Sequence, residues 1–317
     1  MSRIHEALQK AEQERSQGIG NAIVELPVSS VLDDAVLTQL NDAVLAQHVP
    51  AEAHAAMAEP VLSPRSTPPG VDSVIAACPP TEWKPNLQSM LFFDTTKDFV
   101  AGAEQFRTLR SRLAQMREKR PLKTILVGSA MPGEGKSFVA ANLAQAFVRQ
   151  HGRRALLIDG DLRCARLHEY LGTRVGPGVT DFLLGTADES AIILRNSVLD
   201  GLFFIPRGVE VPNPAELIAN GRFKYLLERL APFVDWIVID SPPAVPVADA
   251  SSLAGLCDGV VLVVQSGSTN FELAQKAVHE FRERPLLGVV LNRAVAESGY
   301  GSYYYTGYGS SGAENKR

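Results

Sequence analysis

The residues most able to carry chemistry lie in the segment TILVGSAMPGEGKS, residues 124–137. Its apolar start predicts a buried strand, and a helix resumes at its end. Between the two, Gly133 and Gly135 let backbone N–H groups point at a phosphate, and the helix N-terminus adds a favourable field. Lys136 is placed to reach the β- and γ-phosphates of a nucleotide, and the Ser137 hydroxyl to bind Mg²⁺. The segment predicts a phosphate-binding loop.

One position departs from the usual G-x-x-x-x-G-K-[ST] pattern, because Ala130 stands where the first glycine is expected. Alanine tolerates most loop conformations, so we interpret it as a relaxation of the pattern. The alternative is an ordinary strand-to-helix turn that happens to spell GKS. The loop residues predicted to hold the nucleotide are Pro132, Gly133, Glu134, Gly135, Lys136, Ser137 and Phe138.

Two further motifs end apolar strands in carboxylates. In ALLIDGDLR, residues 155–163, Asp159 and Asp161 project to the same side of an extended chain. Two adjacent carboxylates repel each other, so their presence indicates that a bound cation or a proton transfer uses both. The alternative is a solvated loop with turn-forming Asp and Gly. In VDWIVIDSPP, residues 234–243, Asp240 is a Walker-B-like carboxylate able to hold Mg²⁺.

Helices and strands alternate from residue 91 onward. Apolar strands are expected at 123–128, 155–159, 202–205, 236–240, 260–264 and 287–291. Helices are expected at 104–117, 136–150, 214–230 and 271–282. This alternation predicts an α/β fold with a mostly parallel sheet and helices on both faces. Together with the phosphate-binding loop, it indicates a P-loop NTPase. In such sheets ligands bind beyond the carboxyl ends of the strands, where the three motifs fall.

The first ninety residues differ from the rest in composition. They carry five Lys/Arg against eleven Asp/Glu and are crowded with proline after residue 59. We predict a short helix at 2–15 within a disordered tether covering 1–90, then a folded P-loop domain at 91–297 and a flexible tail at 298–317. The chain has no strongly basic face for nucleic acid, no apolar run that spans a membrane and no signal peptide, which favours a cytoplasmic location.

The set AMPGEGKS, LLIDGDLR and IVIDSPP resembles the Walker A, A′ and B motifs of bacterial tyrosine kinases. These are the P-loop autokinases of capsule and exopolysaccharide biosynthesis, related to the MinD/ParA ATPases. The resemblance covers roughly residues 95–308, and the opening MSRIHEALQKAEQER resembles the stand-alone cytoplasmic type. MinD-like ATPases place a lysine where this chain has Met131, which favours the kinase reading.

The resemblance implies the roles of the site residues. Transfer of the γ-phosphoryl group of ATP to a tyrosine would use Lys136 and the loop amides, with Mg²⁺ held by Ser137, Asp161 and Asp240. Asp159 would accept the phenolic proton, although the sequence does not separate it from Asp161. Asn292 would contact adenine, and Arg163 would help to neutralise the transferring group.

A cluster of tyrosines near the end of the sequence is the expected phosphate acceptor. Five of the seven tyrosines lie among glycine and serine in the last eighteen residues, and they are Tyr300, Tyr303, Tyr304, Tyr305 and Tyr308. By resemblance, this cluster is autophosphorylated by a neighbouring subunit. The alternative is a low-complexity tail without a catalytic role.

Assembly and partners also follow from the resemblance. Glu104, Arg107 and Arg110 match an E-x-x-R-x-x-R helix that joins subunits into a ring-like homo-oligomer, whereas a solvated charged face is the ordinary alternative. A separate transmembrane co-polymerase or chain-length protein would recruit the kinase to the inner face of the membrane, and a tyrosine phosphatase would reset it. Two other functions remain open: a MinD/ParA-like ATPase switch, and a non-catalytic nucleotide-dependent scaffold of polysaccharide export.

Overall fold

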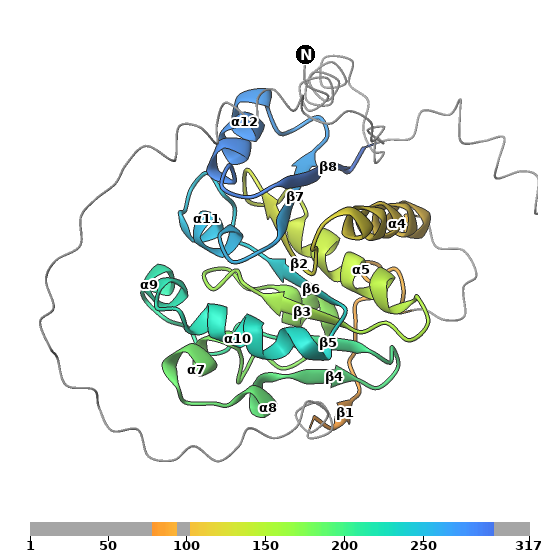
Figure 1. The fold of residues 1–317 in the computed structure, drawn as a ribbon, viewed down its shortest axis with the longest axis vertical. Helices are drawn as coiled ribbons and strands as arrows, with labels where there is room; N and C mark the ends of the chain where they lie inside the picture. Colours follow the sequence, from red (N-terminus) through yellow and green to blue (C-terminus); the bar gives the residue numbers. More distant parts are fainter. Residues whose placement is uncertain (1–77, 94–101, 295–317) are drawn as a thin grey trace, which may run out of the picture. The chain divides into compact units, whose positions relative to one another are not determined.

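The computed structural model describes residues 78–93 and 102–294 of the 317-residue chain. The predicted helix at 2–15 and the tyrosine cluster at 300–308 lie outside these residues. The description below concerns the domain that carries the three motifs (Figure 1).

An eight-stranded sheet forms the centre of the described domain, in the order β1-β4-β5-β3-β6-β2-β7-β8. All neighbouring strands are parallel except β4 and β5. The strands are β1 Pro80–Thr81, β2 Thr124–Ser129, β3 Ala155–Asp159, β4 Leu194–Asn196, β5 Leu202–Ile205, β6 Trp236–Asp240, β7 Gly259–Gln265 and β8 Leu286–Asn292. The predicted mostly parallel sheet is confirmed.

Helices cover both faces of this sheet. The helices are α4 Ala103–Lys119, α5 Lys136–Val148, α6 Leu167–Leu171, α7 Val179–Leu184, α8 Glu189–Ile192, α9 Pro214–Ala219, α10 Arg222–Leu230, α11 Asp249–Ala254 and α12 Phe271–Glu280, with a 3₁₀ turn at Ala231–Phe233. In Figure 1, α4 and α5 lie on one face, and α9, α10 and α11 lie on the other. The helix predicted over 214–230 is two helices, because Gly221 takes a left-handed φ of 82° between them.

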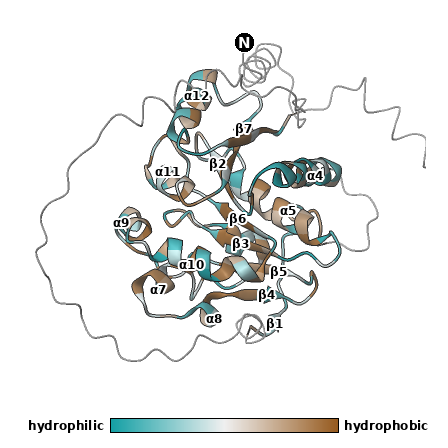
Figure 2. Ribbon diagram, viewed as in Figure 1, coloured by the Kyte–Doolittle hydropathy of each residue, from teal (hydrophilic) through white to brown (hydrophobic). Residues whose placement is uncertain are grey.

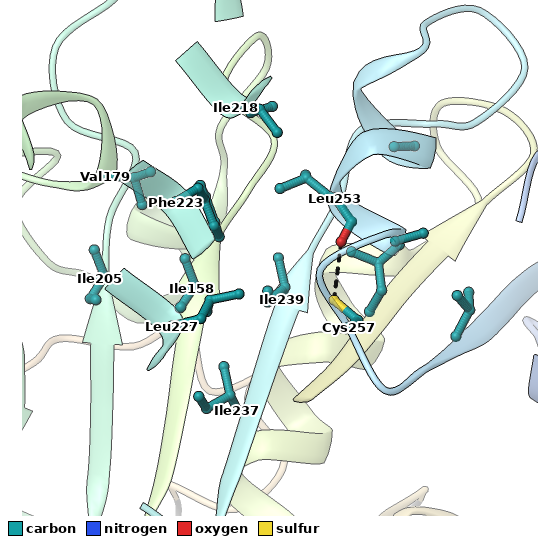
Figure 3. Packing of buried hydrophobic residues seen from close by; sticks show 14 of the residues in the cluster. Ile158, Val179, Ile205, Ile218, Phe223, Leu227, Ile237, Ile239, Leu253 and Cys257 are labelled. Atoms are coloured by element: carbon teal, nitrogen blue, oxygen red, sulfur yellow. Dashed lines mark hydrogen bonds between the residues drawn. The ribbon is translucent and has the colours of Figure 1, made fainter. Parts of the chain in front are cut away.

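Successive residues of the central strands pack into different layers. In β3, Leu156 and Ile158 join the core under α7, α9, α10 and α11, whereas Ala155 and Leu157 join the core under α4 and α5. A strand buried on both faces needs an apolar residue at every position, which explains the unbroken apolar runs of the sequence. Figure 2 shows this apolar character along β7, and Figure 3 shows Ile158 among the side chains of the first core.

Residues 78–93 pack onto the domain, and most of their buried side chains lie in the core under α4 and α5. Trp83 is buried, and the backbone N–H of Leu91 donates to the side-chain oxygen of Asn142 on α5 at 2.8 Å. The strand β1 pairs with β4 at the edge of the sheet, where a proline is tolerated. Residues 78–90, which the sequence analysis assigned to the tether, are therefore part of the folded domain.

Candidate functional site

The phosphate-binding loop connects β2 to α5, as predicted. Gly133 and Gly135 have left-handed φ angles of 85° and 94°, which a residue with a Cβ rarely adopts. A Cβ on Gly135 would also lie 2.0 Å from the side-chain nitrogen of Asn292. Lys136 is the first residue of α5, so the loop ends at a helix N-terminus. This is the local geometry of an anion-binding site.

Asp159 and Asp240 lie side by side at the carboxyl ends of β3 and β6. They are register partners in the parallel ladder, and both are fully buried. Both carboxylate oxygens of Asp240 and Oδ1 of Asp159 lack a hydrogen-bond partner among the described residues. Buried polar atoms without partners are rare in folded proteins and need an explanation, such as a ligand.

Gly160 allows the two strand ends to approach each other. Its backbone N–H donates to the carbonyl oxygen of Asp240 at 2.8 Å. A Cβ at this position would lie 2.6 Å from the same oxygen. The glycine of the LLIDGDLR motif is therefore required by packing at the site.

Lys136 meets the second acidic residue of that motif. Its ammonium nitrogen lies 3.0 Å from Oδ2 of Asp161, and both side chains are largely buried. The other oxygen of Asp161 accepts the backbone N–H of Cys164 at 2.9 Å, which fixes the carboxylate. The structure thus brings Lys136, Asp159, Asp161 and Asp240 together, and their roles remain predictions.

The buried charges at this site shift one another's pKa values. Burial raises the pKa of Asp159 well above its ordinary value, and the neighbouring Asp240 and Asp161 raise it further. Burial also raises the pKa of Asp240 to about 6, against the opposing effects of Lys136 and the Ser137 hydroxyl. Burial lowers the pKa of Lys136, but Asp240, Asp161 and Asp159 outweigh it, so the pKa is raised overall. The positive charge of Lys136 partly offsets the repulsion among these three carboxylates.

Arg163 pairs with a partner that the sequence analysis did not identify. Its Nε and an Nη donate to the two oxygens of Asp249 at 2.7 and 3.1 Å. The Asp249 side chain is almost fully buried at the start of α11, whereas that of Arg163 is 41% exposed. The role of Arg163 in neutralising the transferring group remains a prediction. No local signal marks Asp249, because the two residues are 86 positions apart.

Other predicted nucleotide-binding residues use their side chains within the protein. Phe138 packs edge-on against Phe106 of α4 at a ring distance of 5.8 Å. The carboxylate of Glu134 is buried and accepts the N–H of Met131 at 2.9 Å. The side-chain amide of Asn292 donates to the backbone carbonyl of Glu134 at 2.8 Å, and its contact with adenine remains a prediction.

The predicted interface residues have contacts within this chain. Arg107 pairs with Glu104 at 2.7 Å across one helical turn, with both side chains about half exposed. Arg110 donates to the carbonyl of Ala146 on α5 at 3.0 Å. Arg110 therefore also ties α4 to the helix that follows the phosphate-binding loop. The tyrosine cluster lies outside the described part of the chain.

The residues at this site fit a magnesium-bound nucleotide. Within the described residues, no group of three or more His, Cys, Asp or Glu side chains is arranged to hold a metal alone. Mg²⁺ does not require one, because it is usually bound by one or two carboxylates together with phosphate oxygens and water. The unpartnered oxygens of Asp240, beside the Ser137 hydroxyl, provide such a partial site.

The fold and this loop define a P-loop nucleotide-binding domain. Residues 125–301, more than half of the chain, match the CobQ/CobB/MinD/ParA nucleotide binding domain. Tyrosine-protein kinase YwqD of Bacillus subtilis is 37% identical over 207 residues, which are 64% of this chain and 86% of that protein. Tyrosine-protein kinase CpsD of Streptococcus pneumoniae is 34% identical over 217 residues, 67% of this chain and 94% of that protein.

Solved structures agree with these relatives. The kinase domain of Escherichia coli tyrosine kinase ETK matches with a TM-score of 0.60 and 27% identity, over 67% of this chain and 84% of that one. The chimerical protein CapA2B2 matches with a TM-score of 0.62 and 29% identity, over 72% of this chain and 100% of that one. The chain belongs to the bacterial tyrosine-protein kinases of the CobQ/CobB/MinD/ParA class.

Proposed function

We propose that this chain is an ATP- and Mg²⁺-dependent tyrosine autokinase that phosphorylates its own C-terminal tyrosine cluster and regulates exopolysaccharide or capsule synthesis and export. The observation that carries the proposal is the convergence of Lys136, Asp159, Asp161 and Asp240 beside the phosphate-binding loop. The similarity to tyrosine-protein kinases supports tyrosine as the residue that accepts the phosphoryl group.

Each residue has a task that its surroundings permit. Lys136 and the loop amides hold the phosphates, and α5 presents its N-terminus to them. Asp159 is the group proposed to accept the phenolic proton, because burial and the adjacent carboxylates raise its pKa and make it a better base. Ser137, Asp161 and Asp240 would hold Mg²⁺, which supplies charge neutralisation on the transferring phosphoryl group when bound.

The proposed autokinase would act together with other subunits and with partner proteins. A ring-like assembly through Glu104, Arg107 and Arg110 would present the tyrosines of one subunit to the next. Among the described residues, no helix is long and apolar enough to cross a bilayer. We include in the proposal a separate transmembrane co-polymerase or chain-length protein that recruits the kinase to the inner face of the membrane, and a phosphatase that removes the phosphates.

The central test is mass spectrometry of the purified full chain, incubated with and without Mg·ATP. The proposal expects phosphate on tyrosines of the 300–308 cluster only with Mg·ATP, and none in a Lys136→Met variant that retains the wild-type circular dichroism spectrum. Undiminished phosphotyrosine in Lys136→Met would remove the loop from the reaction. ATP hydrolysis without any phosphotyrosine would favour an ATPase switch instead.

A further inference from the structure

The side chain of Glu134 is buried within the phosphate-binding loop. Only 3% of the residue is exposed, its Oε2 accepts the N–H of Met131, and its Oε1 is hydrogen-bonded to the hydroxyl of Thr269. A buried acid in a loop that receives phosphates is unfavourable, because it is desolvated and repels the ligand. Its presence therefore needs a function that outweighs this effect.

Thr269 is held in a position from which its hydroxyl can hydrogen-bond the Glu134 carboxylate. It lies just beyond the end of β7, is 9% exposed, and its hydroxyl oxygen accepts the backbone N–H of Gln265 at 3.1 Å. Because the oxygen accepts that N–H, the hydroxyl hydrogen is left to donate to Glu134. A side chain from the turn that follows β7, the strand next to β2, thus bonds the centre of the loop.

The end of β8 contacts the same loop residue at its backbone carbonyl. Asn292, the last residue of β8, donates its side-chain N–H to the backbone carbonyl of Glu134 at 2.8 Å. Glu134 is therefore held at its carboxylate from the end of β7 and at its carbonyl from the end of β8. These contacts span 135 and 158 residues of sequence, so they fix the loop relative to the sheet rather than to its own helix.

We propose that Glu134, Thr269 and Asn292 form a latch that sets the phosphate-binding loop in the conformation that binds nucleotide phosphates. Glu134 lies between two glycines with φ angles of 85° and 94°, at the part of the loop where the backbone has most freedom. The latch removes that freedom before the nucleotide arrives, so less order has to be gained on binding. Its members are positioning residues for the nucleotide, and the proposal rests on the proposed nucleotide-dependent function.

The test is isothermal titration calorimetry of ADP with Mg²⁺ on the full chain and its variants. We expect Thr269→Val to weaken ADP binding about tenfold and Glu134→Ala at least as much. The double variant should bind no more weakly than Glu134→Ala, because both changes remove one interaction. Glu134→Gln keeps an oxygen acceptor for Met131 and should retain more affinity than Glu134→Ala.

A matched control separates this positioning role from general stability. Thr180 is a fully buried threonine whose hydroxyl bonds the backbone carbonyls of Arg207 and Val209. Thr180→Val should lower the melting temperature without changing the ADP dissociation constant. If Glu134→Ala does not fold, Thr269→Val combined with Glu134→Gln provides the same cycle.

Two results would overturn the latch: wild-type ADP affinity in folded Thr269→Val, or losses that simply add in the double variant. ADP binding is measured without phosphate transfer, so either result leaves the proposed kinase activity standing. Missing phosphotyrosine in the Mg·ATP experiment would instead overturn the kinase proposal and leave the latch intact.

Discussion

Asp159 and Asp240 are register partners on adjacent parallel strands, and neither carboxylate is exposed to solvent. Two buried acids side by side destabilise a protein unless a cation or a proton is shared between them. Lys136 supplies one positive charge to three carboxylates, counting Asp161. The site is therefore under electrostatic strain that a phosphate-bound metal ion would relieve, and this has measurable consequences for stability.

The first prediction concerns Asp240→Asn without nucleotide or metal. Burial raises the pKa of Asp240 to about 6, so ionisation destabilises the folded state. The penalty is absent below the unfolded pKa near 4, grows between about pH 4 and 6, and is complete above pH 6. Asp240→Asn should therefore be more stable than wild type at pH 8, by about 3 kcal/mol, and equal to it below about pH 4.

Urea unfolding from pH 4 to 8 measures this difference, and Asp235→Asn is the control of opposite sign. Burial tends to raise the pKa of Asp235, but the Arg154 N–H and the Arg153 guanidinium outweigh it, so the pKa is lowered. Its substitution should destabilise the protein across this whole pH range, because the stabilisation by ionised Asp235 is fully present above the unfolded pKa near 4 and is lost only at lower pH. Equal stability of wild type and Asp240→Asn at pH 8 would contradict the strain argument.

A second prediction concerns the pair formed by Arg163 and Asp249. Arg163→Ala leaves the buried Asp249 carboxylate without its charged partner, and this should destabilise the fold by about 2 kcal/mol. The loss is expected to lie below that of a fully buried pair because the Arg163 side chain is 41% exposed. The double variant Arg163→Ala/Asp249→Asn should recover part of the loss in chemical unfolding. No recovery would mean that the arginine acts through other contacts.

The third prediction concerns assembly through α4. Arg107→Ala should weaken self-association and autophosphorylation, because Arg107 and Glu104 are exposed and available to a second subunit. Arg110→Ala should add a loss of stability of roughly 1 kcal/mol, because Arg110 also donates to Ala146. Lys119→Ala, an exposed charge in the last turn of the same helix, is the control. Analytical ultracentrifugation decides the matter: a wild type that stays monomeric with ADP and with ATP rules out the interface.

Much of this site was predictable from local sequence, and the reason is physical. Strands buried on both faces need continuous apolar runs, so β3, β5 and β6 have the bounds that the sequence predicted. Parallel strands also bring their carboxyl ends to one edge, so Asp159 and Asp240 were expected to meet.

Other features depend on pairs that no local pattern reveals. The contact of Glu134 with Thr269 and that of Arg163 with Asp249 join residues 135 and 86 positions apart. The strand β4 was not predicted because three residues between a short helix and a turn carry little periodic signal. Its place in the sheet comes from pairing with β5 rather than from its own sequence.

The last prediction concerns which subunit receives the phosphate. The tail follows β8, whereas Asp159 ends β3, and β2 with the phosphate-binding loop lies between these two strands in the sheet. In the strand order, the start of the tail and the proposed base Asp159 therefore lie on opposite sides of the strand that leads into the phosphate-binding loop. Transfer should therefore occur between subunits. A Lys136→Met chain with intact tyrosines, mixed with an active chain whose five tail tyrosines are phenylalanine, should become phosphorylated, although neither chain becomes phosphorylated alone. Mass spectrometry that finds no phosphate on the Lys136→Met chain in the mixture, while the phenylalanine variant still binds ADP and assembles, would instead indicate transfer within one subunit.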